Sequence, residues 1–339
     1  MVEAIIVHKA MNIVDPVRIE KATKTTASSN HPQSGKKQRT RKEPFHHGRT
    51  SIFCNGKVVT SSDYWWLIGT ALVLYGPIVL YICTQSMRVH EVLGWWVNFI
   101  PLLLAMGTSV FGILAACSDP GILPRHTAPR EAIERNEFEL PPNESLVYHE
   151  LNPEFMLGKN VRLPDGSVQF WKYCNTCELF RPPRCSHCSF CDNCVLEFDH
   201  HCPWLSNCVG RRNYRWFVLF IAGVASLCVS TVVIVSLLVH FESKLFNTKF
   251  YLHAKPWDWI ILMITSAAGL TLLSLTVYHL NAIRLNQTTA EQVKSGRSGA
   301  NSVSKNPGFM ANCHRIFCLP IPKRMINWKQ YKTGSDNIV

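Results

Sequence analysis

Charged residues are scarce in this chain of 339 residues, where Asp, Glu, Lys and Arg together make up 17%. Four runs of at least 24 residues contain none of them, and these runs are 64–87, 92–118, 216–239 and 259–283. A helix of about 20 apolar residues is long enough to span a bilayer. Tryptophans, which favour the lipid headgroup zone, mark several of the run ends. The runs therefore predict four transmembrane helices, with buried core helices of a large soluble protein as the alternative.

The same scarcity excludes several classes of protein. Mean hydropathy is +0.03 although 47% of the residues are hydrophobic, so apolar and polar residues must occupy separate blocks. This composition is not that of a disordered chain, a collagen-like chain or a small disulfide scaffold. A channel or transporter needs ionisable residues within the membrane. The runs contain none of the charged residue types, and histidines such as His240 and His279 lie near the run ends, which speaks against transport.

Acidic residues are also few, at 23 against 35 Lys and Arg, which gives a formal charge of +12. The basic residues concentrate before the first run, in the loop 119–215 and after residue 283. Because cytoplasmic segments carry the excess of Lys and Arg, both termini and the long loop are predicted to be cytoplasmic. The basic N-terminal segment resembles a solvated or lipid-contacting tail. It lacks a folded nucleic-acid module, so we expect no nucleic-acid partner.

These patterns divide the chain into five predicted parts. No signal peptide is recognised, and the first helix is expected to direct insertion. The parts are a disordered basic cytoplasmic tail (1–62), transmembrane helices one and two (63–118), a cytoplasmic loop (119–215) that holds a cysteine-rich domain (172–215), transmembrane helices three and four (216–283) and a cytoplasmic C-terminal tail (284–339).

Eight of the 14 cysteines fall within residues 174–208 of the long loop. Because the cytosol keeps thiols reduced, we expect metal binding or catalysis rather than disulfides. Thiols and imidazoles at two-residue spacing are typical of tetrahedral zinc sites. The possible ligands are Cys174, Cys177, Cys185, His187, Cys188, Cys191, Cys194, His200, His201, Cys202 and Cys208. Two closed four-ligand sites would use eight of these eleven and leave three for other chemistry.

The segment Asp199-His200-His201-Cys202 gathers a carboxylate, two imidazoles and a thiol. A cysteine beside a histidine base is a typical nucleophile, and a carboxylate on the other ring nitrogen fixes the tautomer. Asp199, His200 and Cys202 are therefore candidates for orienter, base and nucleophile, while His201 binds metal. The alternative is that Cys202 is itself a metal ligand and that no catalysis occurs.

The region 174–217 resembles the cysteine-rich domain of the DHHC protein S-acyltransferases, also called palmitoyltransferases. Further motifs of that family are matched by Asp119-Pro120-Gly121 and by Thr288-Thr289-Ala290-Glu291, and Asn312 matches more loosely. The matching residues of the domain are Cys174-x2-Cys177, Arg181-Pro182-Pro183-Arg184, His187-Cys188-x2-Cys191-x2-Cys194, Asp199-His200-His201-Cys202-Pro203-Trp204, Asn207-Cys208-Val209-Gly210 and Asn213.

The resemblance implies a fold and a set of ligands. The expected fold is an all-α polytopic membrane protein with four transmembrane helices and a cytoplasmic cysteine-rich domain of short β-hairpins that binds two structural zinc ions. One ion would take Cys174, Cys177, His187 and Cys194, and the other Cys188, Cys191, His201 and Cys208. His200 and Cys202 then fall at the base and nucleophile of the family, with Asp199 beside them.

The resemblance also implies the reaction. A palmitoyl group, or another long acyl chain, would pass from acyl-CoA to Cys202 and then to a cysteine of a membrane-associated protein. Arg181 and Arg184 match basic positions that would bind CoA, and Trp204 is a candidate acyl-chain contact. We interpret Asp119 as a cap on the end of the second helix and Thr289 as a partner of Asp199.

Several stretches resemble the branch of Ras palmitoyltransferases, whose members tend to work with a small accessory subunit. The expected location is the endoplasmic reticulum or Golgi, or else the plasma membrane. A non-catalytic, membrane-anchored zinc-finger module or adaptor is the alternative function. Such a module has no use for Asp-His-x-Cys beside a membrane helix.

Overall fold

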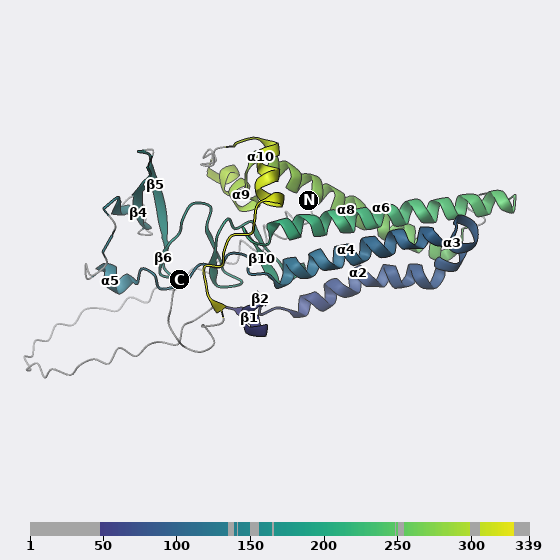
Figure 1. Ribbon diagram of the computed structural model, residues 1–339, viewed down its shortest axis with the longest axis horizontal. Coiled ribbons are helices and arrows are strands. Elements are labelled where there is room, and N and C mark those ends of the chain that lie inside the picture. Colours follow the sequence, from purple (N-terminus) through teal and green to yellow (C-terminus); the bar gives the residue numbers. More distant parts are fainter. Residues whose placement is uncertain are drawn as a thin grey trace, which may run out of the picture. The chain divides into compact units, whose positions relative to one another are not determined.

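Four long helices form the apolar part of the molecule (Figure 1). The computed structural model describes residues 48–134, 139–140, 142–149, 156–164, 166–247, 249, 254–298 and 306–328. The basic tail up to residue 47 therefore lies outside the described residues. The helices long and apolar enough to cross a membrane are α2 (Trp65–Thr84), α4 (Phe99–Cys117) with the preceding 3-10 turn η2 (Trp95–Asn98), α6 (Tyr214–Leu245) and α8 (Pro256–Leu285).

Helix α6 lies at the centre of this group, because it packs against both α4 and α8. More than half of its apolar window is buried (56%), whereas only 6% of the α2 window is. Large apolar side chains such as Leu72 on α2 and Met263 on α8 remain exposed on the outside. An exposed apolar surface of this kind is what a lipid-facing helix presents. The sequence prediction of four membrane-length helices is confirmed.

A buried ionic network joins the ends of three helices away from the cysteine-rich region. Arg88 of α3 (Ser86–Leu93) forms ion pairs with Glu242 of α6 and Asp258 of α8, the latter at 2.8 Å. Gln85 donates to the same Asp258 carboxylate at 2.7 Å. Buried charges require partners, and these residues supply one another. The network was not predicted, because its charged members lie outside the uncharged runs and its residues are far apart in the chain.

The remaining described elements are short. The strands are β1 (Thr50–Phe53), β2 (Val58–Ser61), β3 (Glu144–His149), β4 (Met156–Arg162), β5 (Val168–Cys174), β6 (Leu179–Phe180), β7 (Ser186–Cys188), β8 (Asn193–Val195), β9 (His200–Cys202) and β10 (Asn207–Val209). The short helices are η1 (Cys54–Gly56), α5 (Arg130–Glu134), η3 (Pro203–Leu205), α9 (Thr289–Ser298), α10 (Phe309–Cys313) and the π-helix η4 (His314–Cys318).

The cysteine-rich region consists of antiparallel pairs, as expected for short hairpins. Strand β7 pairs with β8 and β9 pairs with β10. A larger unit was not predicted: β3, β4, β5 and β6 form a four-stranded antiparallel sheet. The sequence carried a signal for part of it, because residues 164–166 read Pro-Asp-Gly. That composition favours a tight turn between two strands.

Part of the segment predicted to be a disordered tail is folded. Residues 50–53 and 58–61 form the β1–β2 hairpin, and Val59, Thr60 and Ser61 are buried. The hairpin is tied to the turn after Cys202, since Ser61 N and Thr60 Oγ1 both donate to the carbonyl oxygen of Ser206. The low hydrophobicity of the whole tail hid this short run, which gains its order from long-range contacts.

Candidate functional site

Eight Cys and His side chains gather into two compact groups, and each group could hold a metal ion. Within each group the ligand atoms all lie within 4.8 Å of one another. These are the two sets that the family resemblance implied. The groups are Cys174, Cys177, His187 and Cys194, and Cys188, Cys191, His201 and Cys208.

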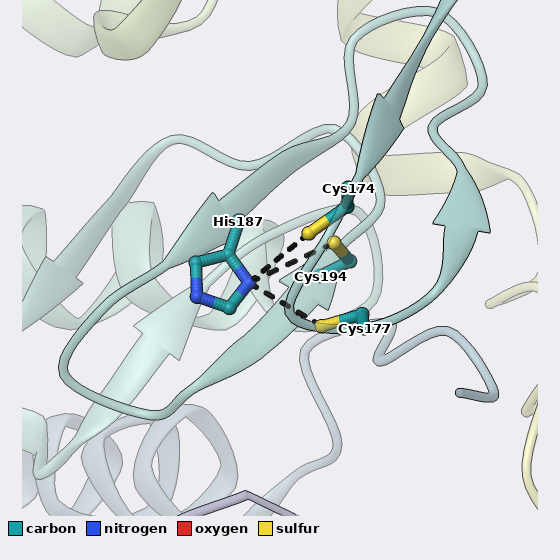
Figure 2. A group of neighbouring side chains, drawn as sticks. All are labelled: Cys174, Cys177, His187 and Cys194. Carbon is teal, nitrogen blue, oxygen red and sulfur yellow. Dashed lines mark hydrogen bonds between the residues drawn. The ribbon is translucent and has the colours of Figure 1, made fainter. Parts of the chain in front are cut away.

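In the first group the imidazole of His187 is directed at three sulfur atoms through Nδ1 (Figure 2). The distances from Nδ1 to the Sγ atoms of Cys174, Cys177 and Cys194 are 3.7, 3.3 and 3.9 Å. Tetrahedral zinc with Zn–S bonds of about 2.3 Å separates its ligand atoms by about 3.3–3.8 Å. The donor set and its spacing therefore fit a tetrahedral ion. Hydrogen bonds from neighbouring thiols also lower the pKa of Cys174, which favours the thiolate that metals bind.

The second group repeats this geometry. Nδ1 of His201 lies 3.4 Å from Sγ of Cys191 and 3.8 Å from Sγ of Cys208, and the two sulfur atoms are 3.3 Å apart. Hydrogen bonds from Cys191 and then Cys208 lower the pKa of the Cys188 thiol. The donor set of this group fits a tetrahedral ion as well.

A carboxylate faces the outer nitrogen of each histidine. Oδ1 of Asp192 lies 3.6 Å from Nε2 of His187, and Oδ2 of Asp63 lies 3.5 Å from Nε2 of His201. These are ion-pair separations, and Nε2 of His201 has no hydrogen-bond partner among the described residues. Carboxylates beside metal-binding histidines commonly orient the imidazole ring. Burial tends to raise the pKa of Asp63, but the hydrogen bond from Ser61 and the charge of His201 lower it overall. Neither carboxylate was predicted, because Asp63 lies outside the cysteine-rich region and no motif assigns a role to Asp192.

The pleat of strand β9 directs the metal-binding His201 to one face of the strand and its two neighbours to the other. Successive side chains of a strand point to opposite faces, so His200 and Cys202 share one face and His201 takes the other. The register places His201 directly opposite Cys208 on β10, and both belong to the second group. Three consecutive residues can therefore serve two sites.

Asp199 is buried, with 2% of its surface exposed, and it joins the start of strand β9 to α9. Its Oδ1 accepts a hydrogen bond from the backbone N–H of Thr289, and its Oδ2 accepts one from the Thr289 hydroxyl, both at 2.8 Å. Oδ2 also lies 2.7 Å from Nδ1 of His200. Thr289 is thus placed where the resemblance implied. Burial by itself would raise the pKa of Asp199, but the bond and charge of His200 lower it to about 2.

His200 is held between Asp199 and Cys202. Burial tends to lower the pKa of the imidazole, but hydrogen bonds with Asp199 and Cys202 and the charges of both groups raise it to about 10. The structure therefore favours an imidazolium that faces a carboxylate on one side and a thiol on the other. A cysteine next to such a histidine is a typical nucleophile.

Cys202 lies at the ends of the long helices. Its side chain is 7% exposed and belongs to a buried apolar cluster with residues from the ends of α4, α6 and α8. Cys313 and Phe317 of the C-terminal segment pack against the same cluster. The buried side chain of Asn312 donates to the carbonyl oxygen of Ile283 at 2.9 Å and so secures that segment to α8.

The two arginines expected to bind CoA have different surroundings. Arg184 is occupied by protein partners, since its Nε and Nη2 lie 2.9 and 3.1 Å from the carboxylate of Glu291, and Asn286 accepts further bonds. In contrast, Nε of Arg181 is buried without a hydrogen-bond partner in the described part of the chain. A buried donor left open in this way favours Arg181 over Arg184 as a ligand-binding group.

Two lysines near Arg181 add to the positive charge around it. Burial lowers the pKa of Lys294, and the charges of Arg181 and Lys172 lower it further. Lys294 lies within reach of the cysteine-rich region, because its Nζ donates to Oγ of Ser186 at 2.7 Å. Three like charges near one another form a site suited to an anion. The sequence analysis named only Arg181 of these three.

Trp204 lies over the first turns of α2. Its carbonyl oxygen accepts a hydrogen bond from the Thr70 hydroxyl at 2.6 Å, and its ring makes an edge contact with Trp66 at 6.2 Å between centroids. The indole is 42% exposed. Trp204 thus joins the catalytic segment to the first membrane helix, with part of its ring available for contact with lipid or an acyl chain.

Two asparagines with no predicted role hold the segment in place. The Asn207 amide donates to the carbonyl oxygens of Val59, Ala116 and Ser118. Asn213 donates to Ala115 and Cys208 and accepts from Gly210 N. Both side chains are buried. These bonds join the hairpin β9–β10 to the end of α4.

The prediction that Asp119 caps the end of the second membrane helix is wrong. Helix α4 ends at Cys117, and Oδ1 of Asp119 instead accepts from the backbone N–H groups of Gly121 and Ile122, at 2.8 and 3.0 Å. The carboxylate therefore stabilises the turn that follows the helix. Gly121 has φ +111°, a conformation that favours glycine.

The fold and the site together define a class of protein: a chain with four membrane-length helices and a metal-binding Cys/His domain that presents an Asp–His–Cys arrangement at the helix ends. The family model described as DHHC palmitoyltransferase matches residues 167–296. The chain is 32% identical to Palmitoyltransferase ZDHHC9 of Homo sapiens over 296 residues, 86% of this chain and 80% of that protein. It is 31% identical to Protein S-acyltransferase 8 of Arabidopsis thaliana over 294 residues, 84% and 70% respectively.

This chain belongs to the DHHC palmitoyltransferase family. It is an enzyme that transfers palmitoyl groups to proteins and an integral membrane protein. A third relative, Palmitoyltransferase ZDHHC18-B of Danio rerio, is 30% identical over 346 residues, which cover 96% of this chain and 84% of that protein. The family recognition and the enzyme prediction are confirmed. The alternative of a non-catalytic zinc-finger module is set aside.

Proposed function

We propose that this palmitoyltransferase uses acyl-CoA as donor and forms an acyl thioester on Cys202. The observation that carries the proposal is the chain Asp199–His200–Cys202, in which a buried carboxylate 2.7 Å from His200 favours the imidazolium beside the thiol. A cysteine beside a histidine that is held by a carboxylate is the typical arrangement of a cysteine nucleophile. Cys202 lies outside both metal-binding groups, so its sulfur is available for acylation.

The reaction then has two balanced steps. In the first, the Cys202 thiolate attacks the carbonyl carbon of the acyl-CoA thioester, the bond from carbon to the CoA sulfur breaks, and the CoA thiolate takes a proton from His200. In the second, His200 takes the proton of a substrate cysteine, whose sulfur attacks the acyl-Cys202 carbonyl and releases the Cys202 thiolate. His200 alternates between acid and base, while Asp199 keeps its orientation.

Two zinc ions would hold the hairpins that carry these residues. The Cys3His donor sets suit structural zinc, which has no open coordination position. The metal therefore supplies rigidity, and no reaction step passes through it. Because His201 is a ligand, a bound ion would fix the backbone on both sides of it, at His200 and Cys202.

The acyl chain would lie between the membrane helices near Cys202. Exposure of a palmitoyl chain to water costs about 0.8 kcal/mol per CH2 group, so the chain needs an apolar environment. Phe217, Phe220 and the exposed part of Trp204 are candidate contacts, since Phe217 and Phe220 belong to or pack against the cluster that contains Cys202. The acyl chain bonded to Cys202 would extend directly from the sulfur atom between the helices.

The CoA phosphates would contact Arg181 together with Lys172 and Lys294. The unpartnered Nε of Arg181 and the mutual repulsion of the cations support this assignment. Arginine binds phosphate oxygens through a planar fork. Arg184 acts instead through Glu291, as part of the joint between the cysteine-rich domain and α9.

Topology and partners complete the proposal. Both termini and the cysteine-rich domain would be cytoplasmic, in the endoplasmic reticulum or Golgi or else the plasma membrane, with the domain limits as predicted above. The surplus of basic residues in the cytoplasmic segments supports this orientation. Substrates would be membrane-associated proteins with an accessible cysteine, and the Ras-palmitoyltransferase resemblance implies a small accessory subunit.

The test is an acylation assay on purified full-length protein. Incubation with a palmitoyl-CoA analogue should give a hydroxylamine-sensitive label, and Cys202→Ser should lose that label while two zinc ions remain bound. Loss of zinc from Cys202→Ser would show that Cys202 is a ligand and overturn the assignment. Cys185→Ser is the matched control, because Cys185 is buried in the same domain but lies outside both groups, and it should keep both label and zinc.

A further inference from the structure

A second histidine lies beside the catalytic one, and the proposed reaction does not use it. His279 of α8 is buried, with 2% of its surface exposed. Its ring centroid lies 6.1 Å from that of His200, although 79 positions separate them in the sequence. A buried polar ring next to a reacting group requires a physical explanation.

A hydrogen bond holds this ring at one nitrogen. The Tyr214 hydroxyl lies 3.2 Å from Nδ1 of His279. Tyr214 begins α6, whereas His279 lies in the last part of α8. The bond therefore joins two membrane helices at the end where Cys202 is located, and it fixes the plane of the His279 ring.

The ring of Phe217 lies in contact with both His279 and His200. The ring planes of His279 and Phe217 are inclined at 83°, with 4.9 Å between their centroids. The planes of Phe217 and His200 are inclined at 68°, with 5.1 Å between their centroids. Perpendicular contacts of this kind are favourable for aromatic rings. Phe217 is itself buried, at 3% exposure, so it has little freedom to move away from His200.

His200 needs this support because Asp199 holds it at a single atom. Hydrogen bonds to Asp199 and Cys202 act at the edge of the ring and leave its faces free to tilt, and such a motion moves the ring nitrogens relative to the Cys202 sulfur. Contacts on the ring from a second direction remove this tilt. Catalytic geometry of this kind has to hold within about 0.5 Å, so small rotations of His200 carry a large cost in rate.

We infer that His279 is a positioning residue: held by the Tyr214 hydroxyl, it seats Phe217 against His200 and keeps His200 aligned with Cys202. The inference rests on the proposed acylation of Cys202. A merely structural role would instead join α6 to α8 and affect stability without affecting the rate of a correctly folded molecule.

The experiment measures acyl-Cys202 formation in single turnovers of the full-length enzyme, at increasing palmitoyl-CoA. His279→Leu should slow the rate at saturating donor about tenfold or more, with the half-saturating concentration unchanged within about twofold. Tyr214→Phe keeps the ring and loses only its hydroxyl, so it should slow the same step about threefold. Because both act through one ring, the double variant should be no slower than His279→Leu alone.

The controls separate this inference from the proposed function. His240→Leu is the matched change, because His240 is exposed on α6, and it should leave the rate unchanged. If Cys202→Ser still acquires the label, the proposed function fails whatever His279 does. An unchanged rate per zinc-loaded molecule in Tyr214→Phe and His279→Leu, additive effects, or a change confined to half-saturation would overturn the positioning role. Should His279→Leu fail to fold, Tyr214→Phe alone decides.

Discussion

The indole Nε1 of Trp328 donates a hydrogen bond to Oδ2 of Asp119 at 3.1 Å, across 209 positions of sequence. The other oxygen of this buried carboxylate is already bound to two backbone N–H groups of the following turn. Trp328 is 2% exposed and belongs to the apolar cluster around the second Cys/His group, with Val59 of the N-terminal hairpin. Trp328 therefore anchors the C-terminal segment against the cysteine-rich domain.

This contact predicts a graded loss of stability. Trp328→Phe keeps most of the packing but removes the indole donor from Oδ2 of Asp119, which costs about 1–3 kcal/mol. Trp328→Ala also opens a cavity and should cost about 3–5 kcal/mol. Thermal unfolding in detergent should therefore rank wild type above Trp328→Phe and Trp328→Ala lowest, with exposed Trp95 changed to Ala as a neutral control. Equal melting temperatures for all four proteins would contradict the role of the contact.

Thr289 is predicted to control the rate through Asp199. Thr289→Val removes the hydroxyl that donates to the Asp199 carboxylate at 2.8 Å and keeps the shape. A hydrogen bond to a charged group contributes about 1.5–3 kcal/mol, so acyl-enzyme formation should slow by roughly 10–100-fold. Thr289→Ser should retain most of the rate. Thr276→Val, which removes a hydroxyl bonded within α8, serves as control, and equal slowing in it would argue against a specific role for Thr289.

Asp63 and Asp192 are predicted to tune one metal site each. Asp63→Asn should weaken metal affinity at the second group about 10–100-fold, because a carboxylate orients the ligating histidine; Asp192→Asn should do the same at the first group. Competition with a chelating dye should therefore release one zinc ion early from each variant and keep the other. Release of both ions together, or no change in either, would show that the carboxylates do not act on separate sites.

Arg181 and Arg184 should respond differently to truncation. Arg181→Ala should raise the half-saturating concentration of palmitoyl-CoA about tenfold, since a charged hydrogen bond to phosphate is lost. Arg184→Ala breaks the part-buried pair with Glu291 and should lower the melting temperature first. Kinetics across donor concentrations, combined with thermal unfolding, separate the two effects. Equal effects of both variants on donor affinity would restore Arg184 as a CoA ligand.

Local patterns of sequence predicted much of this protein. The four helices follow from uncharged runs that contain no competing signal. The assignment of His201 to metal, apart from His200 and Cys202, was predicted from the four-residue segment, and the alternation of strand β9 gives its structural reason. The ligand sets required the family resemblance, because two-residue spacing alone leaves several ways to divide eleven side chains between two sites.

Long-range partners account for what the sequence did not reveal. Asp63, Trp328 and His279 each act on residues far away in the chain, and no local pattern marks them. The β1–β2 hairpin gains its order from Ser206, so its own composition does not distinguish it from a tail. Arg184 matched a basic motif, but its role depends on the distant Glu291. These features require the folded arrangement before their partners can be recognised.

The most direct test of the central claim is a chase of the acyl-enzyme. The full-length protein is acylated with palmitoyl-CoA, freed of excess donor and then mixed with a peptide that carries a cysteine. The account predicts that peptide mapping finds the acyl group on Cys202, and that it passes to the peptide thiol at a rate sufficient for turnover. Acylation at another residue, or acyl-Cys202 that stays intact while the peptide is acylated from added donor, would contradict the account.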